Sequence, residues 1–321
     1  METPTASDTN EALADWLELQ ALQSDAGEAS LESLVRVIRR AGSTDAFAGG
    51  DKGSVESQRV GQDAFSELDN RLLACGAAGY PFDIEQGLIR LKKGGDSSAY
   101  VLMLLMSINK PTAGHEGTAA IFEHLCRHAA HRYLGGDDNQ ARAIRIGAPR
   151  KAPHAKLCQA IDALCLQVAE GGGCRFPHKA QHLGDDGLDI VAWRDFPDLK
   201  AGKLIAFGQC ASGAGDWEEK LAELQSAAYV RKWFRSHLVI DPIRLFFLPR
   251  RVAQDDWEHA SIDGGVLFDR CRIVACLPAN LDADVAALCK KIRADLLGKL
   301  RKPKKVSKTK KLWKSRKAKK K

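Results

Sequence analysis

Residues 184–220 have the sequence GDDGLDIVAWRDFPDLKAGKLIAFGQCASGAGDWEEK, which predicts two adjacent strands followed by a helix. Leu188–Trp193 is apolar except for Asp189, a pattern typical of a buried strand. Leu204–Cys210 predicts the second strand, which carries a polar side chain, Gln209, near its end. Because an unpaired charge in a buried strand is costly, Asp189 is expected to have a partner.

The helix predicted after the second strand brings a lysine close to these polar groups. Asp216 is the expected N-cap, with Glu219 three residues later as in a capping box, and Lys220 lies in the first turn. Mg²⁺ takes oxygen ligands, usually one or two carboxylates together with several waters. A lysine beside it can orient the attacking water or offset charge on a phosphate. The combination therefore predicts a metal-dependent hydrolytic site.

These residues resemble the core of the PD-(D/E)xK nuclease superfamily, in the restriction-endonuclease-like branch that has Gln at the second acidic position. The family pattern is a Glu on a helix, an Asp at the start of a strand and (D/E/Q)-x-Lys on the next strand. Glu123 matches the helical Glu, Asp189 the strand Asp and Gln209 the variant second position. The chain departs from the pattern at Ala211, where the family has Lys. In the superfamily this lysine can move to the following helix, where Lys220 lies.

The resemblance covers residues 115–250 and implies a mixed central sheet flanked by helices. It implies a metal-dependent endonuclease that hydrolyses DNA, with Mg²⁺ or Mn²⁺ held by Asp189 and Glu123. Gln209 would add its carbonyl, and Lys220 would orient the water. Bacterial defence against foreign DNA, with an ATPase or sensor protein as partner, follows from the same resemblance. RNA stays open as a substrate, and Ala211 favours one alternative, a catalytically inactive DNA-binding or scaffold subunit.

The chain of 321 residues divides into a mildly acidic body and a basic end. Residues 299–321 contain fourteen Lys and Arg and no acid, which leaves 34 basic against 41 acidic residues in the remainder. Such a tail is expected to be disordered when free and to bind phosphates in a salt-sensitive way; a solubilising or tethering role is the alternative. The predicted nucleic-acid contacts are Arg231, Lys232 and Arg235 on a helix over Asp216–Arg235, and Lys304, Lys305, Lys310, Lys311 and Trp313 in the tail.

We divide the chain into a helical N-terminal region, residues 1–112, a nuclease-like α/β domain, residues 113–298, and the tail, residues 299–321. The N-terminal helices are predicted over Asn10–Gln23, Leu31–Arg40, Ala64–Cys75 and, as a buried apolar helix, Ala99–Asn109. The Gly- and Ser-rich residues 41–58 predict a linker. The region has no recognisable family signature, so a role as a protein-interaction adaptor stays open. Towards the C-terminus, Gly265–Leu277 predicts a strand and Leu281–Leu297 a last helix.

Two acids and three histidines near the motif are interpreted as structural or surface residues and not as metal ligands. Asp185 and Asp186 precede the first strand in a glycine turn and are interpreted as turn formers. His124, His128 and His131 share one face of a helix predicted over Gly117–Leu134, a spacing that can bind zinc. Without a further ligand set, a solvated histidine face is the favoured interpretation.

Cysteine usage and the N-terminal sequence bear on the compartment. The nine cysteines are spread out with no CxxC pair, which favours reduced thiols in the core. The first residues have neither a basic segment nor an apolar core of a signal peptide. No run approaches the roughly 20 apolar residues of a membrane span. A cytoplasmic protein that does not enter the membrane is expected, with its oligomeric state left open.

Overall fold

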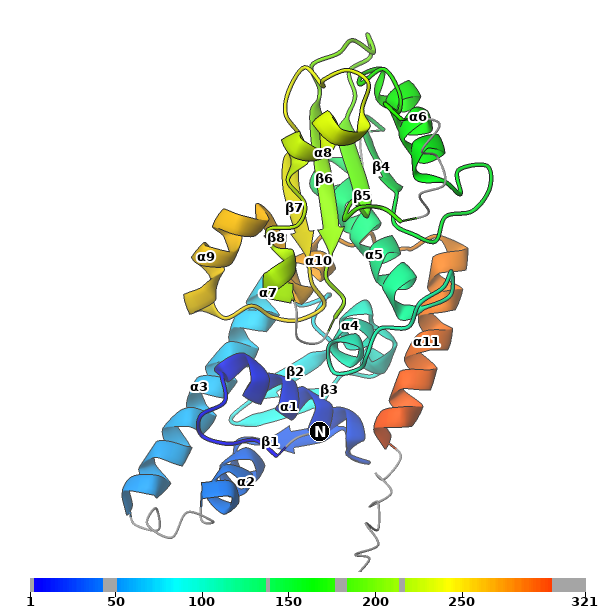
Figure 1. Ribbon diagram of the computed structural model, residues 1–321. Coiled ribbons are helices and arrows are strands. Elements are labelled where there is room, and N and C mark those ends of the chain that lie inside the picture. The colour runs from blue at the N-terminus through cyan, green and yellow to red at the C-terminus, as the bar shows by residue number, and fades with distance from the viewer. Residues whose placement is uncertain (1–2, 43–50, 137–138, 177–183, 214–216, 302–321) are drawn as a thin grey trace, which may run out of the picture.

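The computed structural model describes residues 3–42, 51–136, 139–176, 184–213 and 217–301. A five-stranded sheet with flanking helices forms one end of the molecule, and helices around a small three-stranded sheet form the other (Figure 1). The predicted mixed α/β fold is therefore confirmed.

The five-stranded sheet mixes antiparallel and parallel pairs. Its strands, in spatial order, are β4 (Ala141–Arg145), β5 (Ile190–Arg194), β6 (Leu204–Cys210), β7 (Ile243–Phe247) and β8 (Val266–Phe268). The first three are antiparallel neighbours, whereas β7 runs parallel to β6 and β8 parallel to β7. Ile190 pairs with Gly208 in the register of β5 and β6. The residues one step outward, Asp189 and Gln209, consequently lie at the same end of the sheet.

Helices cover both faces of this sheet because alternate strand residues enter different cores. Helix α5 (Thr118–Tyr133) lies on the face of Ile190 and Ala206, in the largest core. Helices α6 (Leu157–Val168) and α8 (Ser226–Trp233) lie on the opposite face, where Trp193 and Phe207 belong to a second core. This alternation is what period-2 strand patterning produces when both faces are covered.

The N-terminal part is more than a set of helices. Its elements are α1 (Asn10–Gln23), β1 (Glu28–Ser30), α2 (Leu31–Gly42), α3 (Asp51–Cys75), β2 (Phe82–Glu85), β3 (Leu88–Leu91), the 3₁₀ turn η1 (Gly95–Ser97) and α4 (Ala99–Ser107). The predicted α1 and the buried α4 are confirmed. The predicted linker over residues 41–58 is helix wherever it is described, because α2 ends at Gly42 and α3 begins at Asp51; residues 43–50 lie outside the described residues. Strands β2 and β3 form a hairpin whose Gln86-Gly87 turn has φ of 44° and 80°, the positive values of a two-residue hairpin turn.

The C-terminal part departs from the sequence prediction in two places. The helix expected over Asp216–Arg235 is two helices, α7 (Trp217–Lys220) and α8, and Asp216 lies outside the described residues. The strand expected over Gly265–Leu277 ends at Phe268, because Asp269 accepts the N–H of Arg272 at 2.9 Å and caps a helix. The remaining helices are α9 (Gln254–Gly264), α10 (Arg270–Ala275) and α11 (Ala283–Arg301).

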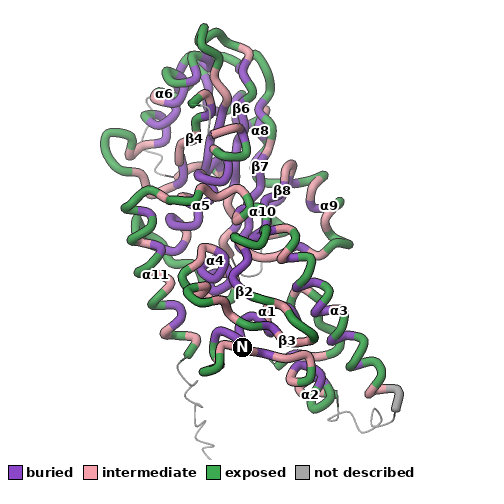
Figure 2. The backbone as a smooth tube through the Cα atoms, turned by 180° about the vertical axis from the view of Figure 1, so that it is seen from behind, coloured by how far each residue is buried: buried purple, intermediate pink, exposed green. Residues whose placement is uncertain are grey.

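One hydrophobic core crosses the predicted domain boundary at residue 112. It contains buried residues of α1, α3 and α4 together with residues of α5, of the five-stranded sheet and of α11. Figure 2 shows these buried segments continuing from the sheet through α4 to the N-terminal helices. Helix α11 packs against both α4 and α5, and so links the two ends of the molecule. No helix in the described part of the chain combines the length and apolar character needed to cross a bilayer.

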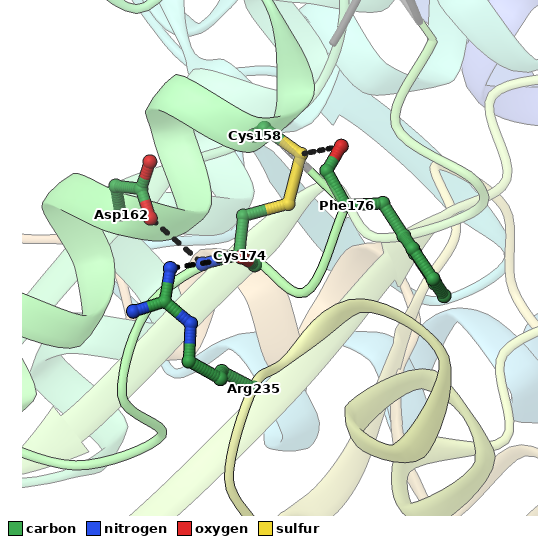
Figure 3. Close-up of a disulfide and its surroundings, with 5 residues drawn as sticks. All are labelled: Cys158, Asp162, Cys174, Phe176 and Arg235. Carbon is green, nitrogen blue, oxygen red and sulfur yellow. Dashed lines mark hydrogen bonds between the residues drawn. A yellow bond between two sulfur atoms is a disulfide. The ribbon is translucent and has the colours of Figure 1, made fainter. Parts of the chain in front are cut away.

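The prediction of reduced thiols throughout is wrong for one pair. Cys158, in the first turn of α6, forms a disulfide with Cys174, with Cα atoms 5.2 Å apart (Figure 3). Positive φ angles at Gly171, Gly172 and Gly173 turn the chain back towards the helix. Asp162 of α6 accepts the N–H of Cys174 at 2.7 Å. The remaining seven cysteines are free, as predicted.

Candidate active site

Asp189 is fixed at the meeting point of three strands. Its N–H donates to the carbonyl of Gly208 at 2.9 Å, and its own carbonyl accepts the N–H groups of Ile146 and Gly147 at 2.7 and 2.9 Å. Its carboxylate Oδ2 accepts the N–H of Cys210 at 2.7 Å. The side chain is buried and is held by the backbone of β6, while its main chain is bonded to β6 and to the residues that follow β4.

Glu123 reaches the same end of the sheet from α5. It is buried, and its Oε2 accepts a hydrogen bond from Nε of Arg145 at 2.5 Å. The chain passes very close to this carboxylate at Gly147, where an added Cβ would stand 2.1 Å from Oε2. Only glycine fits at that position while Glu123 keeps its place.

Asp185 belongs to the same group of carboxylates, although the sequence indicated only a turn. It does form the turn, since its Oδ1 accepts the N–H of Gly187 at 3.1 Å. Its Oδ2 accepts the N–H of Ala148 at 2.9 Å, which ties the turn to the end of β4. The signal available in the sequence was its place directly before a buried strand that begins with another acid.

Burial and neighbouring carboxylates raise the pKa values of Glu123 and Asp189. Burial raises the pKa of Glu123 to about 7, Asp185 adds to the rise, and Arg145 opposes it. Burial raises the pKa of Asp189 well above its usual range, and the charges of Glu123 and Asp185 push it further in the same direction. Clustered carboxylates with raised pKa values are stabilised by a nearby positive charge. Such groups concentrate at functional sites.

Gln209 lies at the same end of the sheet and has an unused acceptor. Its Nε2 donates to Oε2 of Glu223 at 2.6 Å, whereas its Oε1 is buried and has no hydrogen-bond partner among the described residues. Glu223 lies in the break between α7 and α8, which the prediction of one continuous helix concealed. A buried acceptor without a partner is unfavourable, and a cation or a water is the usual remedy.

The lysine of the family pattern has no counterpart at the expected position. Ala211 is fully buried in an apolar cluster with Leu221 and Phe246. Lys220 ends α7, and among the described contacts none joins its ammonium group to Asp189 or Glu123. The guanidinium that contacts Glu123 is that of Arg145, at the end of edge strand β4. Sequence reasoning missed it because it lies outside the motif.

The donor set fits a hard cation in its chemistry. Two carboxylates, Glu123 and Asp189, and the amide oxygen of Gln209 are oxygen ligands of the kind that Mg²⁺ takes. Within the described ranges, no group of three or more His, Cys, Asp or Glu side chains is arranged to hold a metal. The ion pair of Arg145 with Glu123 occupies an oxygen that a metal would use.

The predicted solvated histidine face is wrong. His128 is buried, and Nε2 of His131 lies 3.2 Å from the carbonyl of Ala141 in β4. His124 is half-buried, and burial lowers its pKa to about 4, with Arg145 acting in the same direction. The three rings therefore pack between α5 and its neighbours instead of facing solvent.

Helix α8 brings basic side chains to the turn that precedes Asp189. Tyr229 donates its hydroxyl to the carbonyl of Asp185 at 3.0 Å, and Lys232 pairs with Asp186 at 2.6 Å. Arg231 and Arg235 are exposed. The predicted tail contacts Lys304, Lys305, Lys310, Lys311 and Trp313 lie outside the described residues.

Comparison with protein-family models, with curated proteins and with solved structures returns no significant match. The resemblance to the nuclease superfamily therefore depends on the motif residues themselves.

Proposed function

We propose that this protein is a metal-dependent endonuclease that hydrolyses phosphodiester bonds in DNA. The observation that carries the proposal is that the neighbouring carboxyl groups of Glu123 and Asp189 lie at the end of the sheet where Gln209 also lies. The three residues come from α5, from the turn into β5 and from β6, and they are the residues that match the family pattern. A restriction-endonuclease-like arrangement of the mixed sheet and its helices is part of the same proposal.

Each side chain has a role in this proposal. Glu123 and Asp189 would hold Mg²⁺ or Mn²⁺, with the carbonyl of Gln209 beside them. A metal bound there lowers the pKa of a coordinated water and neutralises charge on the phosphate. Hydrogen bonds from strand backbone keep Asp189 in place, which is the preorganisation that such a site requires. Arg145 supplies positive charge near the phosphate where the motif lysine is missing, and Lys220 stays a prediction for that role.

Cleavage of plasmid and linear DNA in Mg²⁺ or Mn²⁺, against EDTA, tests the proposal. Asp189→Asn keeps the shape of the side chain and is expected to reduce cleavage about 100-fold or more. Asp198→Asn, in the exposed turn after β5, is the matched control and should cleave like the wild type. Lys220→Ala decides whether that lysine takes part, and an RNA substrate decides between the two nucleic acids. Metal-dependent cleavage that survives Asp189→Asn would refute the site.

A second function is favoured by Ala211 and by the ion pair that occupies Glu123. In this alternative the chain keeps a nuclease-like fold and acts as a DNA-binding or scaffold subunit without catalysis. Wild-type protein would then cleave nothing in any metal, and Asp189→Asn would bind DNA as tightly as the wild type. A role in defence against foreign DNA, with an ATPase or sensor partner, extends the proposal through the family resemblance alone.

A further inference from the structure

A large cleft opens along the outer edge of β4, next to the carboxylate group. Its volume is about 1130 Å³, and its walls come from α5, β4, the loop before α6, α6 itself and the start of α11. Sites for small organic ligands usually measure about 300–1,000 Å³. The cleft is therefore large enough for a nucleotide or a short strand, and larger than a single inorganic ion needs.

The lining of the cleft is basic on a body that is otherwise mildly acidic. Its permanent cations are Arg127, Arg145, Arg150, Lys151 and Lys291. Three acids also line the cleft: Glu116, Asp282 and Asp284. Three histidines add further nitrogen donors: His115, His124 and His154. The pairs Arg127–Asp282 and Lys291–Glu116 lie at the rim, with mainly exposed carboxylates. Exposed pairs of this kind are held weakly, so these cations can turn to another anion.

Two buried nitrogen atoms at the inner end have no hydrogen-bond partner in the described part of the chain. They are Nη2 of Arg145 and Nδ1 of His124. The other nitrogens of Arg145 are used, with Nε on Glu123 and Nη1 on the carbonyl of Pro149 at 3.1 Å. A phosphate oxygen that reached the inner end of the cleft would give such a nitrogen a hydrogen-bond acceptor.

We propose that this cleft binds the phosphate groups of a nucleotide or of a nucleic-acid strand. Arginine side chains favour phosphate because the planar guanidinium matches its oxygens in a bidentate way. Partly exposed apolar side chains of the lining, Ile144 and Leu288, offer surface for sugar and base. An acidic peptide would use the charges but not this alternation of charge and apolar surface. The inference goes beyond the proposed function, because binding in the cleft requires neither a metal nor cleavage.

Binding measured in EDTA keeps the test separate from catalysis. The probes are inorganic phosphate, a nucleoside monophosphate, a single-stranded 12-nucleotide DNA with and without a 5′-phosphate, and an oligoglutamate peptide. Lys151→Glu reverses an exposed charge on the cleft wall and is expected to weaken nucleotide and DNA binding at least tenfold. Lys200→Glu, on the exposed turn between β5 and β6, is the matched control and should change binding less than twofold.

The probes identify the ligand as well as the site. Tight binding of the monophosphate identifies a nucleotide site, and binding of the 12-nucleotide DNA alone identifies a strand site; both support the inference when Lys151→Glu weakens them. Tighter binding of the 12-nucleotide DNA that carries a 5′-phosphate than of the DNA without it places a strand end in the cleft. The inference would be overturned if Lys151→Glu and wild type bound nucleotide and DNA with equal affinity, or if oligoglutamate bound more tightly than DNA. Loss of cleavage in Asp189→Asn with nucleotide binding intact separates this site from the carboxylates.

Discussion

Arg145 is the residue that joins the carboxylate group to the cleft. Its Nε donates to Glu123, and its Nη2 is buried beside the cleft without a partner among the described residues. A phosphate bound in the cleft would compete with Glu123 for this guanidinium. Glu123 would then become available to a metal. Through Arg145, occupation of the cleft and metal binding are therefore expected to favour each other, and by linkage the coupling must be reciprocal.

Removing this guanidinium should increase metal affinity. Arg145→Met keeps much of the length of the side chain but removes a cation that competes with the metal for Glu123. Mn²⁺ affinity measured by calorimetry at pH 8 is expected to rise about tenfold. Arg142→Met, on the exposed side of the same strand, is the control and should leave affinity unchanged. Weaker Mn²⁺ binding in Arg145→Met would show that the arginine supports the metal site.

Local sequence patterns predicted the elements of the site but not its contacts. The strands around Asp189 and Gln209 could be recognised because apolar runs with one polar residue are local features. The break between α7 and α8 could not, because Leu221 and Leu224 keep a helical spacing while they enter two different cores. The approach of Arg145 to Glu123 depends on how the end of β4 passes α5. That distance is set by tertiary packing, which no local pattern contains.

The close passage of β4 past α5 at Gly147 gives a test at the scale of these two elements. A methyl group in Gly147→Ala would stand 2.1 Å from Oε2 of Glu123, so the carboxylate or the strand must move. We expect a loss of about 1–3 kcal/mol in the free energy of unfolding, as for other overpacked sites. Mn²⁺ binding should weaken as well, because Glu123 is displaced.

Gly298→Ala provides the matched control for this substitution. Gly298 lies in α11, and an added Cβ would meet nothing within 4 Å there. Alanine in a helix interior should stabilise the protein by up to about 1 kcal/mol. Denaturant unfolding and Mn²⁺ calorimetry on both variants provide the comparison. If Gly147→Ala is as stable as the wild type and binds Mn²⁺ equally well, then Glu123 is not confined by β4.

At the scale of the whole molecule, a buried ionic network holds the N-terminal helices to the rest of the chain. Arg71 of α3 is fully buried and pairs with Asp15 and Glu18 of α1 at 2.7 and 3.0 Å. Arg270 of α10 also pairs with Asp15. Arg251 bridges Glu67 of α3 and Asp269 at 3.1 and 2.5 Å. The network and the shared core favour one cooperative unit, in which residues 1–112 support the sheet.

Breaking this network should therefore destabilise the entire protein. Asp15→Asn leaves Arg71 and Arg270 short of a negative charge in a buried place, which typically costs about 3–5 kcal/mol. Calorimetry should show a single unfolding transition at lower temperature, whereas Asp25→Asn, an exposed control just beyond α1, should unfold like the wild type. Two separate transitions, with only the first shifted, would show that the N-terminal part unfolds on its own.

The loss of unfolding free energy in Asp15→Asn should depend on pH, and the charges around Asp15 set the direction of that dependence. Burial alone would raise the pKa of Asp15, but Arg270 and Arg71 outweigh it and hold the pKa below its usual value. A carboxyl group with a lowered pKa in the folded state stabilises the fold above its unfolded pKa of about 4 and loses that contribution as the pH falls through the folded value. The difference in unfolding free energy between wild type and Asp15→Asn should thus be largest near neutral pH and shrink below about pH 4. Urea unfolding at pH 7 and at pH 3 measures it, and a difference that stays constant would mean that the cost of the substitution comes from packing and not from charge.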